Sequence, residues 1–272
     1  MNFEFYLIDK ILLPMYASLT LDESKIFSRH NHVINFISST GYLFAVVDES
    51  VPLAPRQIRV KGNHLSFNIN TLTLPNTPPP SFDCSLLIPR RDYLNKIVIE
   101  DGWKVLSNKQ SEPRGEFQYL LYKSLKANIK SLFVELEKTR PDLNFPVSKL
   151  LGLGYGLTPT GDDFLSGLLI SLSLAQSPYS HQRNYLVDAI YKSISQTNLI
   201  SAAFISDACK QQISVPIQNF INALLGKDTN NNVISVVTSL GHSSGYDLLS
   251  GLLAGLPHPI ERRKLLCPYI VD

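Results

Sequence analysis

Residues able to do chemistry gather in the stretch 151–169, which reads LGLGYGLTPTGDDFLSGLL. Three glycines alternate with other residues at its start (Gly152, Gly154 and Gly156), and a Gly-Asp-Asp follows them. Glycine accepts backbone angles that other residues resist, so the cluster indicates a loop chosen for its shape. A polar, glycine-rich loop that leads into a helix leaves backbone N–H groups without partners, which is a common way to build a small-molecule site.

Part of this stretch recurs near the C-terminus. The segment Thr160–Leu169, TGDDFLSGLL, aligns with Ser244–Leu253, SGYDLLSGLL, with seven of ten positions identical. In each copy a hydroxyl residue precedes an aspartate by three positions, which is the spacing of a helix capping box. Two roles therefore stand open for Asp163 and Asp247: helix capping and direct contact with a ligand.

Each copy also carries a glycine inside its expected helix, Gly167 in the first and Gly251 in the second. A glycine within a helix costs about 1 kcal/mol relative to alanine, so its recurrence indicates close contact between helices. We predict that the two helices cross near these glycines and bring both preceding loops towards one cleft.

The residues expected to do the chemistry are Asp162 and His242. Asp162 is matched by Tyr246 in the second copy, so neither the repeat nor the capping box requires its carboxylate. His242 is the only histidine beside such a loop, and it is either an acid, base or hydrogen-bond donor or a residue that ties the loop to the backbone. The expected substrate-binding residues are Gly154, Tyr155, Gly156, Thr158, Asp163, Ser243, Gly245 and Asp247.

The adjacent carboxylates Asp162 and Asp163 decide which ligand fits. They stand at the positive end of the helix and repel an anion, so phosphate would need a cation from elsewhere. Carboxylates suit an N–H-bearing amide or ureido group, or a hard cation such as Mg²⁺ with Asp247 as a further ligand. We predict no resident metal, because adjacent aspartates of a helix point about 100° apart and a shared ion would need a third ligand from elsewhere. We also predict no cofactor, because the G-x-G-x-x-G spacing and the preceding strand of a dinucleotide site are both missing.

The elements that must position these residues differ between the two parts of the chain. Residues 1–112 contain short apolar or alternating runs between turn-forming residues and predict an antiparallel β-rich domain. Residues 113–272 predict an all-helical bundle that contains the pair of related loop–helix units, so the fold class is α+β. The expected strands are Ile34–Ile37, Tyr42–Val47, Gln57–Val60, Leu65–Ile69, Ser85–Ile88 and Lys96–Ile99. The expected helices are 116–138, 162–176, 181–196, 198–211, 216–225, 231–240 and 245–256.

Composition narrows the class of protein. With 272 residues, 44% hydrophobic and 18% charged, the chain is typical of a compact globular protein. A net charge of +2 gives no argument for nucleic-acid or membrane binding. Its three cysteines lie far apart, so neither a disulfide framework nor a CxxC metal site is indicated. The N-terminus lacks the pattern of a signal peptide, and we expect a cytoplasmic protein.

Two long motifs carry a resemblance to a known family. GLGYGLTPTGDDFLSGLL resembles the signature G-L-G-x-G-L-T-P-x-G-D-D-x-L-x-G of a bacterial family long catalogued as a domain of unknown function, and SLGHSSGYDLLSGLLAGL resembles its second motif. The segment from Thr197 to Ala203 is a looser match. This family includes one subunit of the oxamate carbamoyltransferase of anaerobic allantoin catabolism, a branch of purine degradation, which works with two larger partner subunits.

The resemblance implies that the chain is a carbamoyltransferase subunit with protein partners. The reaction would convert oxalurate and phosphate to oxamate and carbamoyl phosphate. The Ser-Thr-Arg-Thr phosphate loop of the ordinary transcarbamoylases is absent, so phosphate would need an arginine or lysine from another segment, with Arg56 as one possibility. Two alternatives remain: a non-catalytic metabolite-binding or assembly subunit, and a metal-dependent amide or ureide hydrolase.

Overall fold

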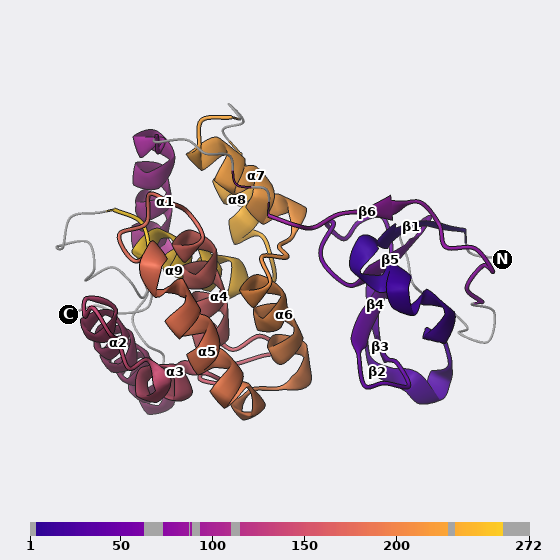
Figure 1. Ribbon diagram of the computed structural model, residues 1–272, viewed down its shortest axis with the longest axis horizontal. Coiled ribbons are helices and arrows are strands. Elements are labelled where there is room, and N and C mark those ends of the chain that lie inside the picture. Colours follow the sequence, from indigo (N-terminus) through magenta and orange to yellow (C-terminus); the bar gives the residue numbers. More distant parts are fainter. Residues whose placement is uncertain are drawn as a thin grey trace. The chain divides into compact units, whose positions relative to one another are not determined.

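The computed structural model describes residues 4–62, 73–86, 88, 93–109, 115–227 and 232–257. The chain divides into two compact units (Figure 1). The sheet unit consists of Met1–Leu86 and Gln212–Pro216, and the helical unit of Leu87–Gln211 and Ile217–Asp272. These units are defined by contacts, and the boundary expected between residues 112 and 113 stays a prediction.

The sheet unit is built on one six-stranded sheet in the order β2-β3-β4-β5-β1-β6. Two of its neighbouring pairs, β4 with β5 and β1 with β6, run parallel, so the expected antiparallel sheet is wrong and the sheet is mixed. Turn-forming residues mark where a strand ends but do not tell whether the chain returns by a hairpin. The strands are β1 (Phe5–Asp9), β2 (Ile26–Arg29), β3 (Val33–Ile37), β4 (Leu43–Val47), β5 (Gln57–Val60) and β6 (Ser81–Phe82).

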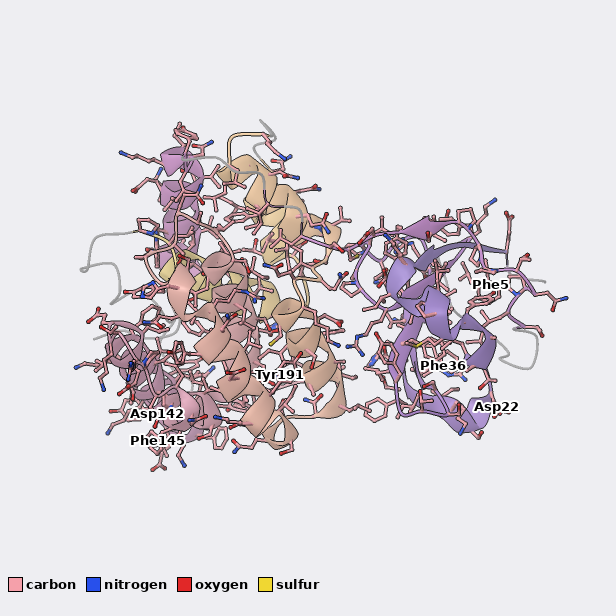
Figure 2. All side chains as sticks on the ribbon, in the orientation of Figure 1. Phe5, Asp22, Phe36, Asp142, Phe145 and Tyr191 are labelled. Carbon is pink, nitrogen blue, oxygen red and sulfur yellow. The ribbon has the colours of Figure 1, made fainter. Side chains whose placement is uncertain are left out.

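One face of this sheet packs into the core of the unit. Leu12, from the 3-10 helix Lys10–Ser18 that follows β1, is fully buried in this core. The rings of Phe36 on β3 and Phe44 on β4 stack with their centroids 5.5 Å apart, and Figure 2 labels Phe36 at this position. Burying such apolar side chains is the main stabilising term of the unit.

The strand predictions have mixed outcomes. The expected strands Ile34–Ile37, Tyr42–Val47 and Gln57–Val60 are confirmed as β3, β4 and β5. Lys96–Ile99 is wrong, because it forms the first turn of a helix, and a four-residue apolar run does not distinguish the two. Ser85–Ile88 is also wrong for its described residues, of which Ser85 alone makes an isolated bridge, and Leu87 lies outside the described residues. The expected strand Leu65–Ile69 lies outside the described residues.

The helical unit confirms the α+β class and the helical nature of the second part of the chain. All seven expected helices are present, with ends shifted by a few residues. Two further helices were not expected: Lys96–Lys109, whose start was predicted as a strand, and Asn144–Leu150, where Pro146 interrupts the pattern. The helices are α1 (Lys96–Lys109), α2 (Glu116–Leu136), α3 (Asn144–Leu150), α4 (Thr160–Leu172), α5 (Arg183–Ser193), α6 (Leu199–Cys209), α7 (Val215–Leu224), α8 (Val233–Thr238) and α9 (Ser244–Ala254).

Helix α4 is the central element of this unit. Every residue from Gly161 to Leu172 is buried, including both aspartates of its first turn. Helices α5, α6 and α9 pack against it (Figure 1). Such a helix has no solvent-facing side, so any polar group it carries must find a partner inside the protein or serve a ligand. None of the helices in the described part of the chain is long and apolar enough to cross a membrane.

Candidate functional site

Helices α4 and α9 cross with their backbones in contact. A Cβ atom added to Gly167 would lie 2.0 Å from the carbonyl oxygen of Leu248, and one added to Gly251 would lie 1.9 Å from that of Phe164. Residues 84 positions apart correspond in the two copies, so these two contacts are the same contact seen from each helix. The predicted crossing at the two glycines is therefore confirmed, and the copies are related by an approximate twofold axis through it.

The correspondence extends beyond the sequence motif. A Cβ atom on Gly161 would lie 2.0 Å from the oxygen of Leu150 at the end of α3, and one on Gly245 would lie 2.1 Å from that of Val237 near the end of α8. Each copy is thus a helix, a loop and a second helix whose start packs against the first. The glycine loop, residues 151–159, is the longer of the two connections.

Neither copy forms the expected capping box. The N-cap residues are Pro159 and Ser243, neither side chain makes a capping hydrogen bond, and Thr160 and Ser244 are already the first helical residues. The backbone supplies the partners instead. Gly161 N donates to Leu153 O at 2.9 Å. Capping therefore does not account for Asp163 and Asp247.

Asp163 and Asp247, the carboxyl pair, occupy matching positions in the first turns of the two crossing helices. Both are buried, with 8% and 1% of their surface exposed. Oδ2 of Asp163 and both oxygens of Asp247 complete no hydrogen bond with a described residue. Buried carboxyl oxygens nearly always have partners, so this pair is the clearest sign of a ligand site in the described part of the chain.

Hydroxyl groups surround the carboxyl pair in the same reciprocal manner. The hydroxyls of Ser244 and Thr158 lie near Asp163 and act to lower its pKa. Those of Thr160 and Ser243 act to lower the pKa of Asp247 in the same way, although neither oxygen of Asp247 completes a hydrogen bond. The two loops are joined directly, since Thr158 Oγ1 and Ser244 Oγ lie 2.7 Å apart in a hydrogen bond. The site thus joins the starts of α4 and α9.

Burial controls the charge of the carboxyl pair. It raises the pKa of Asp163 well above the usual range, and the neighbouring charge of Asp247 raises it further. Burial also raises the pKa of Asp247 to about 8, against the opposing effect of the Thr160 and Ser243 hydroxyls. Near neutral pH the pair therefore holds at least one proton.

Asp162, expected to be catalytic, has a different environment. Oδ1 accepts a hydrogen bond from Gly152 N at 2.7 Å, and Oδ2 accepts one from Ser201 Oγ at 2.6 Å and another from Thr197 Oγ1. The residue is 1% exposed. Its carboxylate thus ties the glycine loop to the start of α6, and its part in the chemistry stays a prediction. The loose motif match at Thr197–Ala203 was the only sequence signal for these partners.

The glycine loop needs its glycines for backbone shape. Gly154 has a φ of +140°, and an added Cβ would lie 2.3 Å from Thr160 N. Gly156 has a φ of +87°, where a side chain is strained. In contrast, the Tyr155 side chain is 56% exposed and that of Leu157 is 50% exposed. The centre of the Tyr155 ring lies 5.5 Å from that of the Phe117 ring. Of the expected binding residues, Tyr155 therefore points largely to solvent.

His242 is the second residue expected to be catalytic. It lies in the turn before α9 and is exposed. The turn places it next to Ser243, whose hydroxyl acts to lower the pKa of Asp247. Its role stays a prediction.

The cation expected to help with phosphate belongs to the sheet unit. Arg56 is buried in the sheet unit, where its guanidinium lies 4.4 Å from the centre of the Tyr42 ring and Nη1 donates to Leu43 O at 3.4 Å. Lys109 was missed in the sequence, and its Nζ lies 4.7 Å from the centre of the ring of Tyr246, the neighbour of Asp247. Among the described residues, no group of three or more His, Cys, Asp and Glu side chains is placed to hold a metal ion.

Residues 150–256 match the model of the family described as oxamate carbamoyltransferase subunit AllH. The matched range includes the glycine loop, both crossing helices and the carboxyl pair. The family link predicted from the two motifs is confirmed by this match. No solved structure matches the chain.

Proposed function

We propose that this chain is a subunit of a carbamoyltransferase of the oxamate carbamoyltransferase type, and that it binds the ureido substrate between the starts of α4 and α9. The observation that carries the proposal is the carboxyl pair: two buried carboxyl groups with unpartnered oxygens, at matching positions inside the range that matches the family. The name of that family also implies protein partners, and we propose that the chain works with other subunits.

The chemistry of oxalurate suits these groups. Its ureido nitrogen atoms carry N–H groups that donate to a carboxylate, and its carbonyl oxygens accept from a protonated carboxyl group. In the proposed reaction a phosphate oxygen bonds to the carbamoyl carbon, and the bond from that carbon to the oxamate nitrogen breaks. The nitrogen gains the proton that phosphate loses, so oxamate and carbamoyl phosphate form without an oxidant or reductant. Orientation and charge stabilisation are the main demands on the protein.

Phosphate needs a positive charge that the helix starts do not supply. The first turn of α4 carries two aspartates, and N–H groups there already donate to the backbone. Lys109, beside Tyr246, is the cation nearest to the start of α9 that the described contacts identify. We propose Lys109 together with cationic groups of a partner subunit as the phosphate-binding groups.

The other predicted residues have supporting roles in this proposal. Gly154, Gly156 and Gly245 shape the backbone around the ligand, and the hydroxyls of Thr158 and Ser243 contact it beside the carboxyl pair. His242 acts from the solvent side as an acid, base or hydrogen-bond donor. Asp162 holds the glycine loop in place.

Reconstitution with the partner subunits tests the proposal. Carbamoyl phosphate formed from oxalurate and phosphate is measured with and without this chain. We expect formation to require the chain and to fall when urea replaces oxalurate, because urea lacks the oxalyl group that becomes oxamate. Equal formation in the absence of the chain would remove it from the reaction.

A non-catalytic binding or assembly subunit is the second candidate. The observation that favours it is the exposed apolar group formed by Tyr155, Leu157 and Phe117 at the glycine loop and the start of α2. Exposed aromatic side chains of this kind are frequent at protein interfaces. In that case the partner subunits alone would catalyse the reaction, and this chain would only raise their stability or their affinity for substrate.

A further inference from the structure

We infer that Asp163 and Asp247 share a single proton and together bind one N–C=O group, the carboxylate accepting its N–H and the carboxylic acid donating to its oxygen. The identity of the ligand rests on the proposed function, whereas the sharing of the proton does not. Neither the family match nor the motif assigns this role to the two residues.

The first support is geometric. The two aspartates are equivalent under the approximate twofold axis that passes between Gly167 and Gly251. Their helices cannot move apart without losing this backbone contact, so the two carboxyl groups are held close in a fixed arrangement. Three of their four oxygens are buried without a hydrogen-bond partner among the described residues. A buried pair of this kind is stable when a ligand completes its hydrogen bonds.

The second support is the charge of the surroundings. On α4, Asp162 adds a further negative charge that raises the pKa of Asp163. From α1, Lys109 lies against Tyr246, and on α3 Lys149 lies 5.6 Å from the ring of Phe145. Helix α8 carries no titratable side chain, and the loop before α9 carries the exposed His242. Helix α6 carries the buried Asp207 together with the Ser201 hydroxyl. No cation is seen in contact with the pair in this part of the chain, so two negative charges are not accommodated there.

The carboxyl pair offers one hydrogen-bond acceptor, the carboxylate, beside one donor, the carboxylic acid, and this determines the class of ligand that fits. An amide or ureido group presents an N–H and a C=O side by side, so it meets both carboxyl groups with one hydrogen bond each. An anionic group is repelled by the charge of the pair. A metal ion would need both carboxyl groups ionised and at least one further ligand. Oxalurate and oxamate each carry an H₂N–C=O end of the required form.

The shared proton also fits the proposed reaction. The transfer needs one proton taken from phosphate and one given to the oxamate nitrogen. If the carboxylate takes the first while the carboxylic acid gives the second, the pair ends with its proton on the other aspartate. Because the two positions are equivalent about the axis, that final state resembles the starting state.

Titration of the full chain without ligand tests the sharing of the proton. The protein is labelled with ¹³C at the aspartate carboxyl carbons, and spectra are compared for the wild type, Asp163→Asn, Asp247→Asn and the exposed control Asp188→Asn. We expect the wild type and the control to show two carboxyl transitions, the upper one above about pH 6 and several units above an ordinary aspartate. Each pair variant should show a single transition that lies below the upper wild-type one, because the neighbouring negative charge is missing. Full ionisation of every aspartate below about pH 5 in a folded wild-type chain would overturn the inference.

Binding of oxamate, followed by calorimetry, tests the ligand class. We expect the wild-type affinity to fall by about tenfold or more as pH rises through the upper transition, because the donor proton is lost. Asp247→Asn, which keeps one titrating carboxyl group, should show a smaller change of affinity over this range. Oxamate binding with no dependence on pH in the wild type contradicts the inference. If the titration and the binding behave as expected but the assembled enzyme makes no carbamoyl phosphate, the proposed function fails and the inference stands.

Discussion

At the scale of single residues, Asp162 and Asp163 show how neighbours in sequence take opposite roles. Successive residues of a helix point about 100° apart, so the two carboxyl groups enter different surroundings. Asp162 meets the glycine loop and α6, where each oxygen accepts hydrogen bonds. Asp163 meets α9 and its partner in the pair. The sequence indicated that aspartates belong to a site here, but not which of them is satisfied, because the partners come from segments distant in the chain.

Replacing Asp162 tests its anchoring role. We expect Asp162→Ala to lower the free energy of unfolding by about 3 kcal/mol, because it leaves the buried Ser201 hydroxyl and Gly152 N–H without their acceptor. Denaturant unfolding of the isolated chain measures the effect. The matched control is Asp188→Ala, an exposed aspartate of α5, which should change stability by less than about 0.5 kcal/mol. Equal effects of the two substitutions would contradict the anchoring role.

The carboxyl pair predicts a pH dependence of stability. A carboxyl group with a raised pKa binds its proton more tightly in the folded chain than in the unfolded chain. Its contribution is therefore complete below the unfolded pKa, 3.8, and is lost as pH rises towards the folded pKa of Asp247, about 8. We expect the free energy of unfolding to fall across this range in the wild type and to fall less in Asp247→Asn. An identical slope in the two proteins would show that Asp247 titrates normally.

At the scale of elements, the repeat was readable from the sequence because its glycines have no purpose within a single helix. Gly167 and Gly251 cost helix stability, and only a close crossing accounts for their recurrence. The residue at which each helix begins could not be predicted from the sequence. Thr160 and Ser244 have the spacing of a capping box, yet each helix begins with them, because the tight packing of Gly161 and Gly245 on the preceding helices sets where the chain turns.

Alanine at the crossing should separate the helices. We expect Gly167→Ala and Gly251→Ala each to lower the free energy of unfolding by about 3 kcal/mol or more, since the new methyl group meets backbone atoms that have little room to move. Gly102→Ala in α1 is the matched control, because its Cβ would meet only the end of the Leu253 side chain, at 2.9 Å. That variant should stay within about 1 kcal/mol of the wild type. Stable crossing variants would show that the contact is looser than described.

At the scale of the whole molecule, composition and periodicity were enough to predict the α+β class and the long helices. The mixed sheet could not be predicted from the sequence. Strands β4 and β5 pair in parallel although only a short connection without a helix joins them. Helix α1 was missed altogether, because its first four residues fit a strand as well as a helix. The sequence also did not show which site residues have hydrogen-bond partners within the protein. Those partners depend on contacts between α4, α6 and α9, which no local sequence pattern predicts.

Assembly can be separated from catalysis at the glycine loop. We expect Tyr155→Ser to weaken binding to the partner subunits by about tenfold if the exposed apolar group with Phe117 is an interface, without lowering the stability of the isolated chain. Calorimetric titration of the chain with its partners measures this. Tyr185→Ser, at an exposed tyrosine of α5, serves as the control. Unchanged affinity in Tyr155→Ser would remove the loop from the interface.

The central claim is that the carboxyl pair between α4 and α9 is where the carbamoyl substrate reacts. The most direct measurement is the rate of carbamoyl phosphate formation from oxalurate by the assembled enzyme carrying Asp163→Asn or Asp247→Asn, with Asp188→Asn as the control. We predict a loss of about 100-fold or more in each pair variant and none in the control, because one proton donor or acceptor is missing. Rates within about twofold of the wild type in both pair variants, with normal assembly, would contradict the account.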